Sequence, residues 1–216
     1  MADEELNGKR KNIDENQRTS SFSDNFKEHP ATPPPSPSQP LDIADSSTSS
    51  GRVKSDVIPA KYPWATTQRA HLRTLNDILS SGVRTIIGRV GCDFNWTHNQ
   101  DLEFDLQREF NQVASFVAAN KSTMFHRIPE VWLYPPRSCS KCNKVRFVRP
   151  IISKKKRSIN WLFLLLGEML GYCSSDQLKY FCKHSNIPHN GGRDELICLT
   201  YLGLCKQLDP SGPFDP

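Results

Sequence analysis

The chain has 216 residues, with 28 Lys and Arg against 23 Asp and Glu, for a formal net charge of +5. Domains cluster near about 100–150 residues, so this length suits one domain and a tail. The seven cysteines are an odd number and the first residues, MADEELNGKRKN, contain no apolar signal-peptide core. We therefore expect an intracellular protein, nuclear or cytoplasmic, with reduced thiols, in which paired cysteines serve as metal ligands rather than disulfides.

Composition divides the chain at about residue 60. Residues 1–60 hold few large apolar side chains and have 7 Lys and Arg against 10 Asp and Glu, whereas the remainder has 21 against 13. A segment such as the first cannot bury enough apolar surface to offset its ordering entropy. We therefore expect a disordered acidic Ser/Pro-rich tail over 1–60, a basic folded domain over 61–210 and a frayed C-terminus over 211–216.

The domain is expected to begin with a helix and a hairpin. Apolar residues recur at helical spacing from Leu72 to Leu79, with Thr66 or Thr67 as the N-cap and Gly82 as the stop. The β-branched run that follows predicts a strand over 83–90, and LEFDL at 102–106 alternates apolar and acidic residues as its hairpin partner.

Helical spacing resumes directly after this hairpin, from Leu106 to Val117, and predicts a long amphipathic helix. Prolines bracket VWLY at 131–134, which we interpret as a short extended segment. KVRFVR at 144–149 alternates as a third strand, and Pro150 indicates an edge or an end.

The C-terminal half is expected to be helical. Ser158 can cap an apolar helix over 159–170, which Gly171 would end. Its apolar stretch is about a dozen residues long and is interrupted by Glu168, whereas a membrane span needs about 20, so no membrane anchor is expected. Ser174 and Gln177 form a capping-box pattern before DQLKYFCKH, and a last helix follows NGGRDEL. The predicted fold class is α+β, with a small antiparallel sheet carrying zinc-ribbon-like knuckles and a helical C-terminal half.

Cys139 and Cys142 have the spacing of two thiolate ligands on one tight knuckle, and zinc would need two more. Cys92, at the end of the first strand, is the best third ligand. A second knuckle of the same form would place the next ligand at Asn95, whose amide oxygen suits zinc poorly. His98 can complete the site if the hairpin turn folds back, and the alternative is a knuckle that keeps its shape without metal. The other cysteines lie among apolar helix residues and are expected to be buried; they are Cys173, Cys182, Cys198 and Cys205.

A basic block surrounds and follows this knuckle. Residues 137–157 contain nine Lys and Arg and no acidic residue, which favours an anionic partner. Nucleic acid is one such partner, with Phe147 or Trp96 available for stacking. The candidate contacts are Arg146, Arg149, Lys154, Lys155, Lys156 and Arg157.

The strings KYPWATTQRA, SINWLFLLLGEMLG, DQLKYFCKH and LTYLGLCKQLDP resemble the shared domain of a plant family described only as a domain of unknown function, over about residues 61–210. Members carry a Cys-x2-Cys in the first hairpin as well as in the later knuckle, so the resemblance implies a four-cysteine zinc site. Cys92, Cys139 and Cys142 match that pattern, and the sequence departs from it at Asn95. A substitute His98, a bound water or loss of the metal are the alternatives.

The sequence carries no phosphate-cradling glycine loop and none of the common hydrolase motifs. A non-enzymatic interaction module with a structural zinc site and an unknown protein partner is therefore the first functional hypothesis. Nucleic-acid binding through residues 137–157 is the second, and a metal-dependent enzyme is a distant third.

Overall fold

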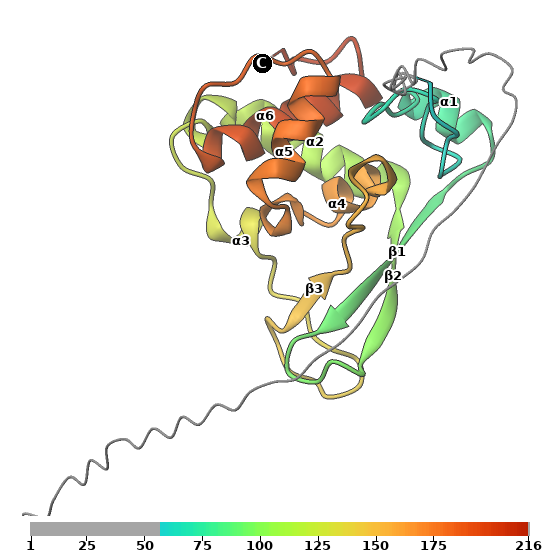
Figure 1. The fold of residues 1–216 in the computed structure, drawn as a ribbon, viewed down its shortest axis with the longest axis vertical. Coiled ribbons are helices and arrows are strands. Elements are labelled where there is room, and N and C mark those ends of the chain that lie inside the picture. The colour runs from blue at the N-terminus through green and yellow to red at the C-terminus, as the bar shows by residue number, and fades with distance from the viewer. Residues whose placement is uncertain (1–56, 216) are drawn as a thin grey trace, which may run out of the picture. The chain divides into compact units, whose positions relative to one another are not determined.

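The computed structural model describes residues 57–215. Within them the elements follow in the order α1 (Leu75–Ser80), β1 (Thr85–Cys92), β2 (Asn99–Asp105), α2 (Leu106–Met124), α3 (Glu130–Leu133), β3 (Val148–Pro150), the 3-10 turn η1 (Lys156–Ser158), α4 (Trp161–Leu166), the 3-10 turn η2 (Leu170–Tyr172), α5 (Ser175–His184) and α6 (Arg193–Leu208) (Figure 1). The predicted α+β class and helical C-terminal half are confirmed. The predicted tail lies outside the described residues except at its last four positions, 57–60.

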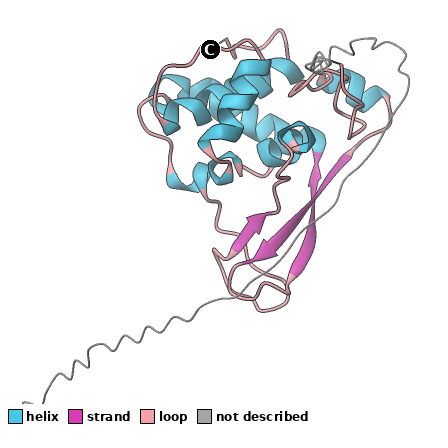
Figure 2. Cartoon of the chain, in the orientation of Figure 1, coloured by secondary structure: helices cyan, strands magenta, loops and turns pink. Residues whose placement is uncertain are grey.

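The three strands form an antiparallel sheet in the order β2-β1-β3. β1 and β2 make the predicted hairpin, with Gly91 opposite Asn99 where it turns. β3 pairs with the other side of β1, so that Cys92 lies opposite Val148, and Pro150 occupies an edge, where its missing N–H is tolerated. The strands project from the helices, and the loop between β1 and β2 lies beside the loop that precedes β3 at the far end of the sheet (Figure 2). We call this end the tip.

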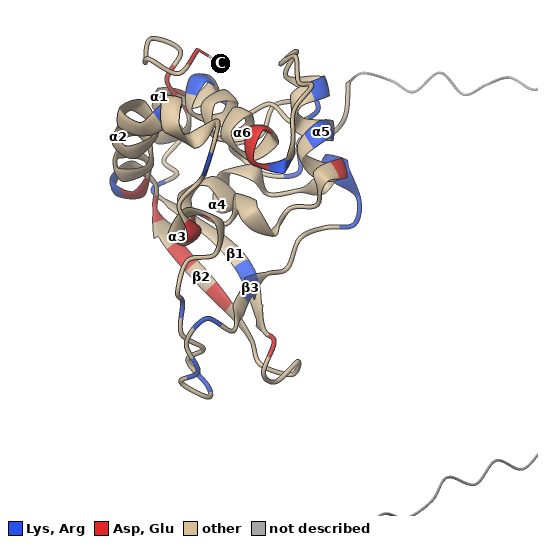
Figure 3. Cartoon of the chain, turned by 90° about the vertical axis from the view of Figure 1, so that its left-hand side faces the viewer, with Lys and Arg blue, Asp and Glu red and all other residues tan. Residues whose placement is uncertain are grey.

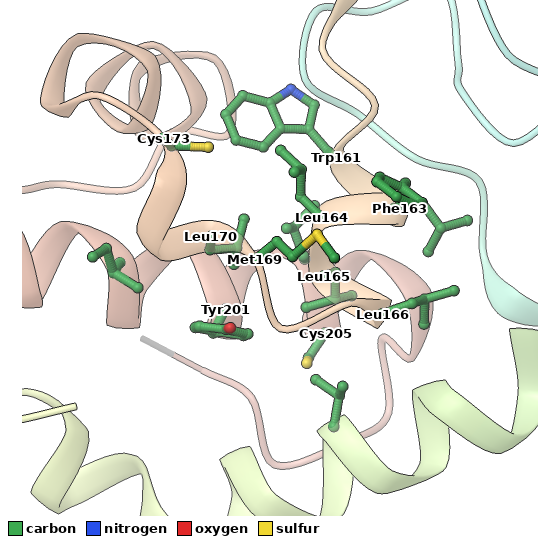
Figure 4. Close-up of a cluster of buried hydrophobic side chains, with 14 of the residues drawn as sticks. Trp161, Phe163, Leu164, Leu165, Leu166, Met169, Leu170, Cys173, Tyr201 and Cys205 are labelled. Atoms are coloured by element: carbon green, nitrogen blue, oxygen red, sulfur yellow. The ribbon is translucent and has the colours of Figure 1, made fainter. Parts of the chain in front are cut away.

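The core is built around α6, which is buried along almost its whole length and packs against α2, α4 and α5. Side chains of α4 and η2 pack toward Tyr201 and Cys205 of α6 (Figure 4). The Tyr201 hydroxyl donates a 3.0 Å hydrogen bond to the Trp132 carbonyl, so this buried polar atom is satisfied. The Trp132 ring stacks on Phe116 of α2 with ring centroids 3.8 Å apart. Buried residues of the strands and of the knuckle, including Val148 and Cys139, belong to the same hydrophobic cluster, so one core extends from the helices toward the tip.

Two helices start where the sequence predicts, because their caps are local. Asp105 ends β2 and accepts a 2.8 Å hydrogen bond from the Arg108 N–H, so α2 begins directly after the strand. At α5 the capping box is complete: the Gln177 N–H donates to the Ser174 hydroxyl, and the Ser174 N–H donates to the Gln177 side chain.

Two other expectations are wrong, one about the start of a helix and one about an extended segment. The first helix is capped by Thr74, not by Thr66 or Thr67, and begins at residue 75. Ala70 has a φ of 58°, a left-handed conformation that a right-handed helix cannot pass through. The predicted extended segment VWLY is the single helical turn α3, which starts after Pro129 and ends before two further prolines.

The third strand and the fourth helix are shorter than predicted. β3 covers only 148–150, because Arg146 adopts a φ of 69° and the chain before it follows the knuckle. α4 covers 161–166 and is capped by Asn160, whose side chain accepts from the Phe163 N–H, so Ser158 is not its cap. It stops at Gly167, because Glu168 then takes a φ of 59°.

The C-terminal residues pack on the domain where the sequence predicted a frayed end. The Phe214 side chain is 3% exposed and belongs to the core. The Lys206 ammonium lies 2.9 Å from the Asp215 carboxylate, which links the last described residue to α6.

Candidate metal centre

The loop after β1 folds back on itself, which the sequence made a condition for His98 to serve as a ligand. The Cys92 N–H donates a 3.0 Å hydrogen bond to the His98 carbonyl, so the two residues face each other across the turn. Asn95 sits at the bend, and its side-chain oxygen accepts from the N–H (3.0 Å) and the hydroxyl (2.8 Å) of Thr97. Asn95 therefore shapes the turn and is not one of the candidate ligands. His98 lies where its ring can serve as a ligand.

The second loop is a tight knuckle. The Cys139 N–H donates to the Lys144 carbonyl at 3.0 Å, and the Asn143 N–H donates back to the Cys139 carbonyl at 2.8 Å. Asn143 has a φ of 55°, a left-handed conformation that asparagine tolerates better than most residues. This turn brings Cys139 and Cys142 to the same side of the loop.

Three contacts hold the two loops together. The Gln100 side-chain oxygen of β2 accepts from the N–H (2.9 Å) and the hydroxyl (2.5 Å) of Ser140. The Asp93 N–H donates to the Phe147 carbonyl at 2.8 Å, and the Asp93 carboxylate forms an ion pair with Arg149. The role of Gln100 carries no signal in the sequence, because it depends on how two loops about 40 residues apart pack.

These contacts bring Cys92, His98, Cys139 and Cys142 into one cluster whose donor atoms all lie within 4.8 Å of one another. The four cysteine and histidine residues that the sequence singled out thus form a potential metal-binding site. All four carry nitrogen or sulfur donors, the set that zinc prefers in structural sites. Here the knuckle and the hairpin turn each supply two of the four donor residues.

The spacing of the donors fits a tetrahedral ion. The sulfurs of Cys92 and Cys142 are 3.7 Å apart, and the Cys139 sulfur lies 3.8 Å from Nδ1 of His98. Zinc–sulfur bonds of about 2.3 Å give a tetrahedral sulfur–sulfur edge of about 3.8 Å, and a zinc–nitrogen bond of about 2.0 Å shortens the mixed edge to about 3.5 Å. The first edge agrees with zinc, and the second needs a shift of a few tenths of an ångström.

One thiol of the knuckle, that of Cys139, is prepared for deprotonation, as a thiolate ligand requires. Burial acts to raise the pKa of Cys139, but N–H donors of Lys141 and Cys142 together with the Cys142 and His98 side chains lower it to about 6. The Lys144 N–H acts to lower the pKa of Cys142, yet burial and the neighbouring sulfurs raise it overall. The first proton therefore leaves Cys139.

The remaining cysteines behave as the sequence predicted. Cys173, Cys182, Cys198 and Cys205 are fully buried among helical side chains. Burial raises the pKa of Cys173 and of Cys198 to about 12, so these thiols stay protonated and act as small apolar groups.

Exposed aromatic residues surround the potential metal site. Phe94 and Phe147 pack edge to face with ring centroids 5.8 Å apart, one from each loop. Trp96 is 80% exposed and lines, with Ile151, a pocket of about 340 Å³ that also includes Cys92. We call these four exposed side chains, Phe94, Trp96, Phe147 and Ile151, the tip patch. Neighbouring sequence does not distinguish them from core residues, because only the loop conformation turns them outward.

The structure divides the basic stretch 137–157 between two places. Arg146 and Arg149 lie at the tip, where they pair with Glu130 (3.6 Å) and Asp93. Residues 155–157 lie instead beside α5, away from the basic residues of the tip (Figure 3). The six predicted nucleic-acid contacts therefore do not form one continuous surface.

Residues 75–208 match the model of the family described as Domain of unknown function (DUF7086). The chain belongs to this family. No curated protein and no solved structure matches the chain. The family match spans α1 to α6 and includes all four residues of the potential metal site. None of the described helices combines the length and the apolar character needed to cross a membrane.

Proposed function

We propose that this domain is a non-enzymatic interaction module whose tip is held together by a structural zinc ion. One observation carries the proposal: four Cys and His donors from two separate loops converge directly beneath an exposed aromatic patch. Four protein ligands fill a tetrahedral shell and leave no position for water or substrate, which favours a structural role over a metal-dependent enzyme. The thiol ligands must stay reduced, which supports an intracellular location.

The tip patch is the surface that we assign to the partner. Aromatic side chains are enriched at the centres of protein interfaces, and rims are polar. Here the rim is basic, since Lys141 and Lys144 are exposed on the knuckle and the Lys144 ammonium lies 5.1 Å from the Phe94 ring centre. A protein segment that presents apolar side chains flanked by Asp or Glu fits this surface.

The test has two parts, and the first is metal content. The full chain purified without added metal should hold about one zinc per molecule by elemental mass spectrometry. A variant with Cys139→Ser and Cys142→Ser should hold none. A well-folded parent without zinc would refute the structural ion.

The second part compares binding partners in cells. A variant with Phe94→Ser and Trp96→Ser removes half of the tip patch but leaves all four donors, so it should retain zinc. Proteins captured by the parent and lost with this variant should bind the purified parent with a Kd at least about 30-fold tighter than the variant, since even one buried aromatic anchor contributes about 2 kcal/mol or more. Equal affinity of the parent and the variant for every captured protein would refute the assignment of the tip patch as the binding surface.

Nucleic-acid binding is the second candidate, and the exposure of Trp96 is the observation that favours it. An exposed indole can stack on a base, and Lys141 and Lys144, which are exposed on the knuckle of the same tip, can neutralise phosphates. This candidate uses the tip alone, with Lys141 and Lys144 in place of residues 154–157. Fluorescence anisotropy with mixed oligonucleotides would test it: affinity that falls steeply with salt and is lost with Trp96→Ala supports it, and salt-independent or absent binding rejects it.

A further inference from the structure

The last residues of the basic stretch, 155–157, belong to a second surface, apart from the tip. This surface forms a groove of about 850 Å³ between η1 and α5. Its lining comes from three separate segments: the loop before α1, the residues at η1 and one face of α5. We call it the basic groove. Its lining residues are Arg69, Lys155, Lys156, Arg157, Asp176, Lys179, Tyr180, Lys183 and His184.

Five cations of the basic groove, the four lysines and Arg157, have no carboxylate partner among the described residues. At the tip, by contrast, Arg146 and Arg149 each have a carboxylate partner. Asp176 is the single carboxylate that lines the groove, and it lies in the first turn of α5, where the helix dipole favours it.

The geometry concentrates these charges on one spot. Lys179 and Lys183 are four residues apart on α5 and therefore project from the same face. Arg69 and Arg157 line the groove together with Tyr180 of α5. Burial raises the pKa of the Tyr180 hydroxyl, and the positive charges of Arg69 and Arg157 act to lower it. Cations from all three segments thus surround a common space.

We propose that the basic groove binds a compact ligand carrying several phosphate groups, of the class of inositol polyphosphates. The volume lies within the about 300–1,000 Å³ typical of small-ligand sites. Six Lys and Arg side chains match a ligand with many negative charges, and guanidinium groups bind phosphate oxygens in pairs. This proposal does not depend on the zinc site or on the tip patch.

The same groove suits a nucleic-acid strand less well. A strand needs an extended basic track and aromatic faces on which bases stack. The aromatic side chain of the groove, Tyr180, packs against His184 with ring centres 4.5 Å apart, so its ring already has a neighbour. The cations come from three separate segments that line one concavity.

The test is isothermal titration of the full chain with inositol hexakisphosphate at about 0.15 M salt, where loose surface binding is screened. We expect saturable binding of one ligand per chain, no binding of uncharged inositol, and competition by inorganic phosphate only at far higher concentration. A variant with Lys155→Glu and Lys183→Glu should bind at least about 100-fold more weakly, at about tenfold for each reversed charge. The milder pair Lys155→Gln and Lys183→Gln should weaken binding in the same direction and keeps the test valid if the first variant does not fold.

The matched control carries the same charge change outside the groove, with Arg84→Glu and Arg127→Glu. It should keep the affinity of the parent within about threefold, because at this salt the screening length is about 8 Å. Equal losses in both variants would mean that net charge alone attracts the ligand, and would overturn the proposal. So would tighter binding of a 12-nucleotide single-stranded RNA that inositol hexakisphosphate cannot displace.

Discussion

His98 is the ligand that the sequence could place only conditionally, so its removal is the most informative single change. His98→Ala deletes one of four donors, whose ring nitrogen lies 3.8 Å from the Cys139 sulfur. Structural zinc sites bind with apparent free energies of about 10–16 kcal/mol, so one donor in four accounts for about 2.5–4 kcal/mol. The Kd for zinc should therefore rise by roughly two to three orders of magnitude.

Competition against a chromophoric chelator of known affinity measures this change. His98→Cys supplies a sulfur from the same position and should keep the Kd close to that of the parent, because zinc accepts four thiolates. His126→Ala, at an exposed histidine just beyond α2, is the matched control and should change nothing. An unaltered Kd in His98→Ala would show that the fourth position is not held by this ring, and the account of the folded-back turn would fail.

Three further predictions concern reactivity and packing. In chelator-treated protein, alkylation of Cys139 should rise with pH through about 6, since its lowered pKa makes it mostly thiolate at neutral pH; a midpoint near 9 by mass spectrometry would contradict this. Gly171→Ala should destabilise the fold by about 1–3 kcal/mol in urea unfolding, because a Cβ would lie 2.3 Å from the Leu133 carbonyl oxygen, which cannot rotate away; an unchanged midpoint would refute the close approach. Tyr201→Phe should cost about 1–2 kcal/mol, because it leaves the buried Trp132 carbonyl without its donor, and parental stability would disprove that.

Local signals in the sequence predicted the elements whose determinants are local. The capping box at Ser174 is read within four residues and occurs as expected, and the helix predicted from Leu106 onward begins at that residue. The burial of the helical cysteines follows from their apolar neighbours. Where the backbone leaves the right-handed region, as at Ala70 and Glu168, the sequence gives no warning, and there the predicted helices are displaced or too long.

The candidate site was predictable in its residue types but not in its geometry. The spacing of Cys139 and Cys142 by itself predicts a knuckle. Whether His98 or Asn95 is the fourth candidate ligand depends on a turn in which the Asn95 side chain accepts hydrogen bonds from Thr97. The spacing of the cysteines in the sequence cannot reveal that turn. The basic groove was hidden for a related reason: half of its cations come from segments outside the basic block, and only tertiary packing brings Lys179 and Lys183 beside η1.

The two halves of the metal site are distant in sequence: 41 residues separate His98 from Cys139, and 50 separate Cys92 from Cys142. A metal that joins them closes a long loop containing β2, α2 and α3. On the chain-entropy scale used for disulfides, a closure of this length restricts the unfolded chain by about 4 kcal/mol. Such an ion works as a reversible cross-link, whose strength follows the free zinc concentration. Loss of such an ion would loosen the tip first, because α6 packs mainly against α2, α4 and α5 and not against the two loops that the ion joins.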